Sequence, residues 1–207
     1  MLFLFGKLKL KRWRTYSNEM KCRIFQSLEN KFAKKQFRRP ENVVVNYDSR
    51  FKSAGMFCNS ESGNIIYLNP YYITDNERRF AALYTILHEG RHATQYEKAV
   101  AREPRWYEFT KRRWRTNWNA YVGSNEDPVM YENQVLERDA DGYAIKMMNR
   151  LRFKYRKEKD FKQILQARVE KFEKDEKLAM ERSGLFAKWI IHWKIRNRAK
   201  KRHRQRF

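Results

Sequence analysis

A chain of 207 residues, 42% of them hydrophobic, can bury one sizeable core, so we expect one domain with helical additions and not several domains. The formal net charge of +23 lies at the ends: residues 1–40 carry 12 basic and 2 acidic side chains, residues 41–149 carry 14 and 15, and residues 150–207 carry 21 and 7. The apolar N-terminal stretch is only five residues long, which argues against a signal peptide and a membrane span. Cys22 and Cys58 are far apart in the sequence, which argues against a disulfide framework and favours a cytoplasmic protein.

The first predicted elements are one helix and three strands. Residues 16–37 have apolar side chains at helical spacing among basic ones, which predicts a basic amphipathic helix within an N-terminal segment of residues 1–40. Short β-branched or apolar runs at residues 43–47, 54–58 and 65–68 predict three strands, and a turn-forming segment between the last two predicts an antiparallel hairpin. A helix then begins near Thr74 or Asp75.

This helix carries an H-E-x-x-H pattern, formed by His88, Glu89 and His92. Residues four apart lie about 40° apart around an α-helix, so both imidazoles can reach one metal ion and Glu89 can reach a water molecule beside it. Two histidines that only pack on a helix are the alternative, but the apolar residues around them predict a buried helix. Gly90 costs about 1 kcal/mol relative to alanine in a helix interior, which indicates a packing or site requirement there.

Residues 102–127 combine aromatic and basic side chains. A helix that packs through its aromatic residues is the first interpretation, and a basic aromatic surface that binds nucleic acid or a peptide is the alternative. A further helix is predicted at residues 129–148, followed by two basic helices at residues 153–179 and 185–199. Together these elements predict an α+β fold: a small antiparallel sheet of about three strands, packed on the active-site helix and a second, glutamate-bearing helix in a domain of residues 41–149. Long basic helices extend it at residues 1–40 and 150–207.

A zinc site of the H-E-x-x-H type needs a third protein ligand. Glu137 and Asp141 are four residues apart and share one face of the helix at residues 129–148, whereas Asp139 lies on another face. One of these carboxylates suits a metal ligand, and the other suits an acceptor that orients a ligating histidine. A solvated acidic face is the alternative, but its pairing with the H-E-x-x-H helix favours the metal site.

The segment from Glu137 to Ala144, with the sequence E-R-D-A-D-G-Y-A, resembles the E-x-E-A-N/D-x-F-A segment of ImmA/IrrE-type zinc metallopeptidases, a gluzincin-like group. In that family the segment follows the H-E-x-x-H helix, and the predicted hairpin at residues 55–69 is similar to the hairpin that leads into it. The resemblance covers about residues 41–149. It implies that His88, His92 and Glu137 bind Zn²⁺ and that Glu89 is the general base.

These observations predict a zinc metalloendopeptidase that hydrolyses a protein substrate held along the edge of the hairpin. Tyr121, Tyr131 and His192 are candidates for stabilising the oxyanion by residue type alone. The alternative is a nucleic-acid-binding protein with a structural or vestigial zinc site, because basic chain ends bind phosphates and tryptophans stack on bases. Both functions are compatible in a protease that acts at nucleic acid. A membrane surface is the least favoured partner, and the sequence gives no sign of an oligomeric state.

Overall fold

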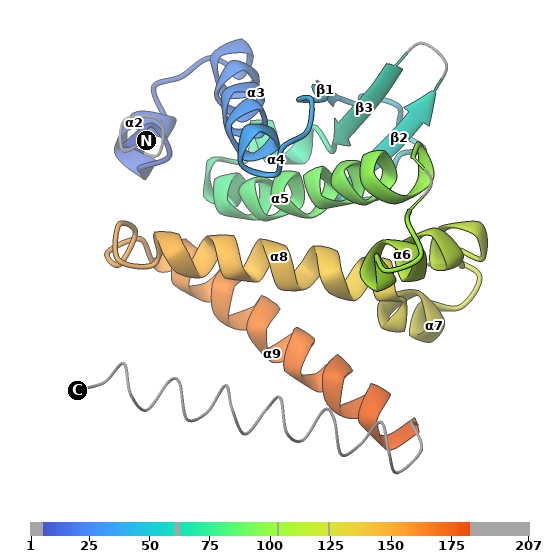
Figure 1. The fold of residues 1–207 in the computed structure, drawn as a ribbon. Helices are drawn as coiled ribbons and strands as arrows, with labels where there is room; N and C mark the ends of the chain where they lie inside the picture. Colours follow the sequence, from blue (N-terminus) through green and yellow to red (C-terminus); the bar gives the residue numbers. More distant parts are fainter. Residues whose placement is uncertain (1–5, 61–62, 103, 124, 183–207) are drawn as a thin grey trace. The chain divides into compact units, whose positions relative to one another are not determined.

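A computed structural model describes residues 6–60, 63–102, 104–123 and 125–182. The chain divides into two compact units, Met1–Val169 and Glu170–Phe207. The first unit has the predicted α+β fold, with a three-stranded sheet and a set of helices around one long central helix (Figure 1). The predicted helix at residues 185–199 lies outside the described residues.

We predicted an antiparallel sheet, but the sheet is mixed. Its strands are β1 (Asn42–Val45), β2 (Gly55–Ser60) and β3 (Gly63–Leu68), in the order β1-β3-β2. The hairpin of β2 and β3 is antiparallel, as expected, but β1 runs parallel to β3. The reason is that β3, the second strand of the hairpin, lies in the centre of the sheet. β1 pairs with β3, and these two strands run in the same direction. This order leaves β2 as an edge strand.

The helices surround α5, the helix that carries the H-E-x-x-H pattern. Asp75 caps the turn before it, since its side chain accepts a hydrogen bond from the amide of Glu77. The helical elements of the described chain are α2 (Leu10–Trp13), α3 (Asn18–Lys35), α4 (Tyr71–Thr74), a 3-10 turn (Asn76–Arg78), α5 (Arg79–Gln95), a π-helical turn (Tyr96–Val100), α6 (Phe109–Asn119), α7 (Pro128–Asn133), α8 (Val135–Leu151) and α9 (Lys159–Arg182).

The core of the first unit forms around α5, in which 14 of 17 residues are buried. Helix α3 packs its apolar stripe against α5, and α8 covers α5 on another side (Figure 1). Downstream of α8, Tyr155 and Phe161 pack against Phe80, with ring centroids 4.7 and 5.1 Å from it. Residues 8–32 and 155–165, which belong to the segments that we expected as extensions, therefore contribute to the same core as residues 41–149.

Two predicted helices have different limits in the structure. The helix expected at residues 129–148 is divided at Gln134, because the buried amide of this residue pairs with the backbone of Val122 through its oxygen and its nitrogen. The helix expected from residue 153 begins at Lys159 as α9, since residues 152–157 form turns that bring Tyr155 into the core.

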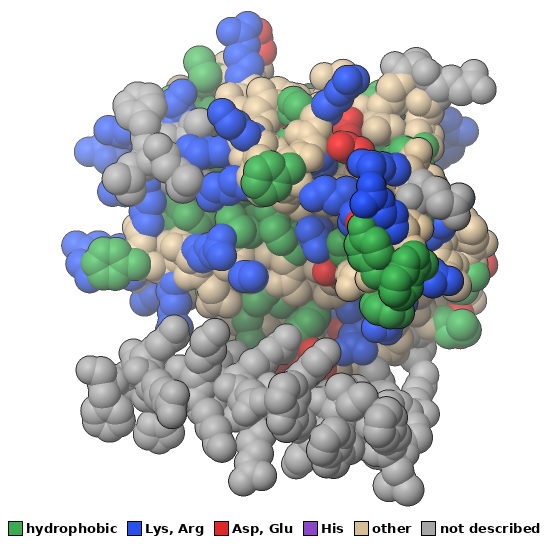
Figure 2. All heavy atoms as spheres, in the orientation of Figure 1, with side chains coloured by type: hydrophobic (Ala, Val, Ile, Leu, Met, Phe, Trp, Pro, Cys, Tyr) green, Lys and Arg blue, Asp and Glu red, His purple; other side chains and the backbone are tan. Residues whose placement is uncertain are grey.

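Basic side chains are spread over the surface. Figure 2 shows many Lys and Arg side chains and few acidic ones on the face that it presents. Among the described residues, no helix combines the length and the apolar character needed to cross a membrane.

Candidate metal centre

The packing of α5 against α8 brings the three predicted ligands together. His88 and His92 lie one turn apart on α5, and Glu137 lies in the first turn of α8. The Nε2 atoms of the two histidines are 3.0 Å apart. Each is 3.2 Å from one oxygen of Glu137, which is almost fully buried. One ligand atom of each residue lies within 4.8 Å of the others, so this group could hold a metal ion.

The donor set suits a divalent metal ion such as zinc. Zinc binds imidazole nitrogen and carboxylate oxygen at about 2.0–2.2 Å, so tetrahedral ligand atoms are separated by about 3.3–3.6 Å. The two Nε2 atoms are 3.0 Å apart, and each lies 3.2 Å from a different oxygen of Glu137, so the separations are slightly shorter than this value. Two imidazoles and one carboxylate are also the protein ligands of one class of catalytic zinc site, in which the fourth position stays open.

Asp141, the second carboxylate on the predicted face of α8, fixes the orientation of His88. Its carboxylate lies 2.8 Å from Nδ1 of His88 and also accepts a hydrogen bond from the hydroxyl of Tyr84. Because a carboxylate accepts and does not donate, the Nδ1 atom of His88 carries the proton and Nε2 faces Glu137. Burial alone would lower the pKa of His88, but its hydrogen bonds to Asp141 and Glu137 outweigh burial and raise the pKa to about 10.

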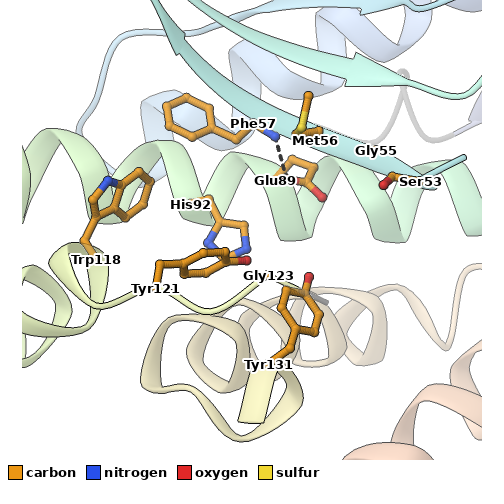
Figure 3. A pocket seen from close by; sticks show the side chains of 10 residues that line it. All are labelled: Ser53, Gly55, Met56, Phe57, Glu89, His92, Trp118, Tyr121, Gly123 and Tyr131. Atoms are coloured by element: carbon orange, nitrogen blue, oxygen red, sulfur yellow. Dashed lines mark hydrogen bonds between the residues drawn. The ribbon is translucent and has the colours of Figure 1, made fainter. Parts of the chain in front are cut away.

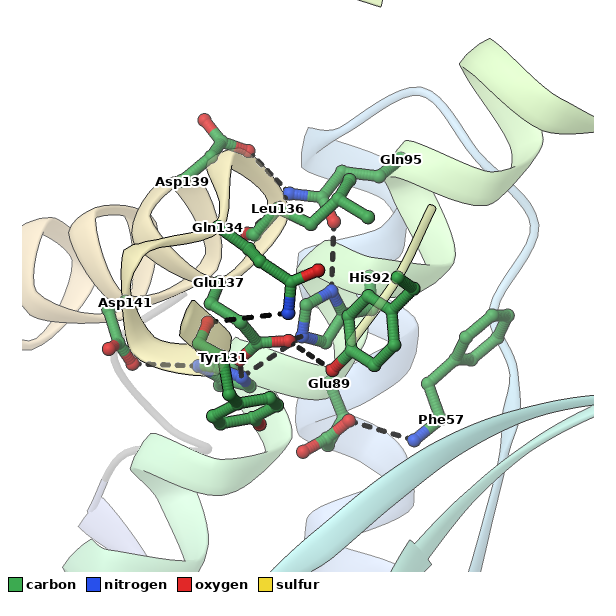
Figure 4. A network of polar contacts seen from close by, with 12 residues as sticks. Phe57, Glu89, His92, Gln95, Tyr131, Gln134, Leu136, Glu137, Asp139 and Asp141 are labelled. Atoms are coloured by element: carbon green, nitrogen blue, oxygen red, sulfur yellow. Dashed lines mark hydrogen bonds and ion pairs between the residues drawn. The ribbon is translucent and has the colours of Figure 1, made fainter. Parts of the chain in front are cut away.

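His92 is oriented by Gln95, a residue for which we predicted no role in the site. The Oε1 atom of Gln95 lies 2.8 Å from Nδ1 of His92 (Figure 4). The amide nitrogen of Gln95 donates to the backbone oxygen of Leu136 and to Asp139, so its oxygen must face the histidine. His92 therefore donates from Nδ1 to Gln95, and its Nε2 atom faces the site. The signal in the sequence is the spacing, because Gln95 lies three residues after His92 on one helix face.

Glu137 is held in its ionised form. Burial raises the pKa of its carboxyl, but the charge of His92 and hydrogen bonds from both imidazoles lower that pKa well below its ordinary value. Tyr121 donates a hydrogen bond of 2.6 Å to Glu137. Burial and the neighbouring Glu137 carboxylate raise the pKa of Tyr121 and of Tyr131, so both hydroxyl groups keep their protons.

Glu89 lies on the open side of the site, next to the sheet. Its carboxylate accepts a hydrogen bond of 2.8 Å from the backbone amide of Phe57 in β2. A cavity of about 360 Å³ opens beside Glu89 and His92 and has a largely aromatic wall (Figure 3). Its lining residues are Ser53, Gly55, Met56, Phe57, Glu89, His92, Trp118, Tyr121, Gly123 and Tyr131.

The environment of Gly90 explains the glycine in the motif. A Cβ atom at this position would lie 2.8 Å from Nη2 of Arg38 and 2.9 Å from Oε2 of Glu29. These two side chains form a fully buried ion pair against the backbone of α5. Gly90 is therefore required by packing and not by the metal site itself.

The structure thus brings together His88, Glu89, His92, Glu137 and Asp141 at one site. Among the candidates for oxyanion stabilisation, Tyr121 and Tyr131 line the cavity, and His192 lies outside the described residues. The sequence did not indicate Tyr84 or Phe57, because their roles depend on how α8 and β2 pack against α5, whereas the spacing of Gln95 from His92 was a signal within one helix.

Comparison with known proteins adds no relative. No family model matches the chain, and neither a curated protein nor a solved structure matches it. The resemblance to ImmA/IrrE-type metallopeptidases therefore stays a prediction that depends on the residues named above.

Proposed function

We propose that this chain is a zinc-dependent metallopeptidase of the gluzincin-like, ImmA/IrrE type. The observation that carries the proposal is the convergence of His88, His92 and Glu137 beside a cavity that is lined by His92 and Glu89. A three-ligand group beside a carboxylate in a cavity wall is the arrangement that metal-assisted hydrolysis requires.

The residues of the site have distinct roles in this reaction. A bound zinc ion acts as a Lewis acid that acidifies water and polarises a carbonyl group. Glu89 accepts the proton of the attacking water on its carboxylate and later delivers it to the nitrogen of the leaving amine. Tyr121 and Tyr131 have protonated hydroxyl groups in the cavity wall. Either one can donate a hydrogen bond to the oxygen that gains negative charge once it turns its single proton away from Glu137.

The edge strand β2 supports a peptide as the substrate. An extended peptide can add to the free edge of a sheet through backbone hydrogen bonds. β2 pairs with β3 along only one side, and its residues Gly55, Met56 and Phe57 line the cavity. A peptide on this edge would pass directly beside Glu89.

A purely structural zinc site is less well supported. Structural zinc sites have four protein ligands and are closed, whereas catalytic sites have three and an open position. Within the described residues, the cluster has three ligands and borders a cavity.

Two measurements test the proposal. Mass spectrometry of protein purified without added zinc should find close to one zinc ion per chain, and substitution of His92 by alanine should remove it.

Cleavage of unfolded protein substrates should fall about 10²–10⁴-fold in Glu89→Gln, because the general base is lost. Glu19→Gln is the matched control, since Glu19 is exposed on α3 and pairs only with Arg23 there. Absence of metal, or equal cleavage by wild type and Glu89→Gln, would contradict the proposal.

A further inference from the structure

Three large aromatic side chains are exposed next to one another before and at the start of α6. Trp106 is 76% exposed, Tyr107 49% and Phe109 68%. The rings of Trp106 and Tyr107 meet edge to face, with centroids 5.7 Å apart. Exposed apolar side chains that are grouped in one place, with polar residues around them, mark interaction sites on proteins. The proposed peptidase site uses none of these three residues.

Guanidinium groups surround these rings. Arg105 donates a hydrogen bond to the hydroxyl of Tyr107, and Arg112 donates one to the backbone oxygen of Trp106. Arg113 is exposed on the same helix. Figure 2 shows apolar side chains grouped among Lys and Arg side chains over the region where Figure 1 places α6.

Glu108 does not cancel this positive charge. It is the only acidic residue between positions 104 and 125. Its carboxylate pairs with Lys111 and accepts a hydrogen bond from the backbone amide of Arg105. The positive charge of the surrounding arginines is therefore available to an anionic partner.

A groove of about 720 Å³ continues this surface between α6 and the helices that follow. It is lined by Phe109, Arg112, Arg113, Thr116, Asn117, Ala120, Met130, Asn133, Gln134 and Val135, and has no carboxylate among these residues. Asn117 binds both the side chain of Gln134 and the backbone amide of Leu136. These bonds fix α6 to the start of α8, so the groove is preformed.

We infer that this surface, residues 105–116 together with the groove, binds single-stranded nucleic acid. Aromatic rings stack on unpaired bases whatever their sequence, and arginines neutralise the phosphates between them. A base-paired duplex hides the faces of its bases and would leave the three exposed rings without a partner. An acidic peptide would satisfy the arginines but would not stack on the rings.

The test uses the full chain and a fluorescently labelled oligothymidine that spans a site of about 4–16 nucleotides. Trp106→Ala and Phe109→Ala should each weaken binding at least about fivefold, because one stacked base is lost. Phe153→Ala is the matched control: Phe153 is 79% exposed and lies outside the surface, so this variant should bind the oligothymidine as tightly as wild type does.

The arginines are tested by the dependence of the binding constant on salt concentration. The variant Arg112→Ala/Arg113→Ala should lower the slope of log K against log salt concentration by about 1.4, at about 0.7 per phosphate contact. The control Lys34→Ala/Arg39→Ala, which removes two exposed charges elsewhere, should lower it less.

Three outcomes would overturn the inference. Equal affinity of the aromatic variants and the control would mean that general phosphate attraction accounts for binding. Competition by polyglutamate as strong as that by unlabelled oligothymidine would mean that the surface takes acidic polypeptide. Tighter binding of a duplex of the same length would exclude stacking on the exposed rings. Each outcome is independent of zinc content and peptidase activity.

Discussion

His92 shows how one amide can set the chemistry of a metal ligand. A ligating imidazole must keep its proton on the nitrogen that faces away from the metal. Gln95 imposes this on His92, since both hydrogens of its amide are directed to Leu136 and Asp139 and its oxygen is left to accept. Arg91 in turn holds Asp139 by an ion pair of 2.7 Å. The orientation of His92 therefore depends on a chain of contacts that extends to the surface.

Substitution of Gln95 by leucine should weaken zinc binding by about 10–100-fold, because His92 loses the acceptor that fixes its tautomer and ring orientation. The affinity can be measured by competition with a chelator of known zinc affinity. Gln26→Leu is the matched control: Gln26 also makes two hydrogen bonds to backbone groups, at Glu41 and Val43, but it has no contact with the site. An unchanged affinity of Gln95→Leu, or an equal loss in both variants, would contradict the role of Gln95.

At the scale of elements, the approach of β2 to α5 determines where Glu89 lies. A Cβ atom at Gly55 would lie 2.4 Å from Cγ2 of Thr85 and 2.9 Å from the backbone oxygen of Tyr67. Only glycine lets the strand come this close, and this closeness allows the amide of Phe57 to bind Glu89. The position of Glu89, the proposed general base, thus depends on a residue with no side chain.

Gly55→Ala should lower the free energy of unfolding by about 1–3 kcal/mol, the usual cost of overpacking. Thr85→Ser removes the nearest methyl group and keeps the hydroxyl, so the double variant should recover part of this loss. Urea unfolding of the two single variants and the double variant gives the coupling between the positions. Strictly additive losses would show that the contact with Thr85 does not cause the cost.

The elements that the sequence predicted well are those with strong local patterns. The hairpin, the helix of the H-E-x-x-H motif and the shared face of Glu137 and Asp141 follow from periodicity and turn residues alone. The division of the helix at Gln134 and the pairing of β1 with β3 depend on partners distant in the sequence. Tertiary contacts override local propensity at such places, and a single sequence does not show them.

At the scale of the molecule, a buried ion pair connects α3 to the active-site helix. Arg38 binds both oxygens of Glu29, at 2.6 and 3.0 Å, and donates a third hydrogen bond to Thr94 of α5. Neither charged side chain is exposed. Removal of one partner leaves the other charge buried without compensation, which costs much more than removal of both.

Glu29→Leu should therefore lower the free energy of unfolding by about 3–5 kcal/mol, whereas the double variant Glu29→Leu/Arg38→Met should lose considerably less. Chemical denaturation measures both values. Arg23 and Glu19 form an exposed pair on the same helix, and the same comparison there should show changes of at most about 1 kcal/mol. A double variant less stable than the Glu29→Leu protein would mean that the pair contributes more by its attraction than it costs by its burial.

Zinc binding should also stabilise the first unit as a whole, since the ligands come from two helices that meet only in the folded chain. A ligand that binds only the folded state adds about 2.7 kcal/mol of stability when its free concentration is 100 times Kd. For a chain of this size, that is a rise of roughly 5–10 °C in Tm. Thermal unfolding with and without zinc should show this rise in wild type and should not show it in His92→Ala or Glu137→Gln. Glu89→Gln should keep the full rise, because Glu89 contacts the backbone of Phe57 and is not among the three ligands. Loss of the rise in Glu89→Gln would place Glu89 among the ligands and would contradict its assignment as the general base.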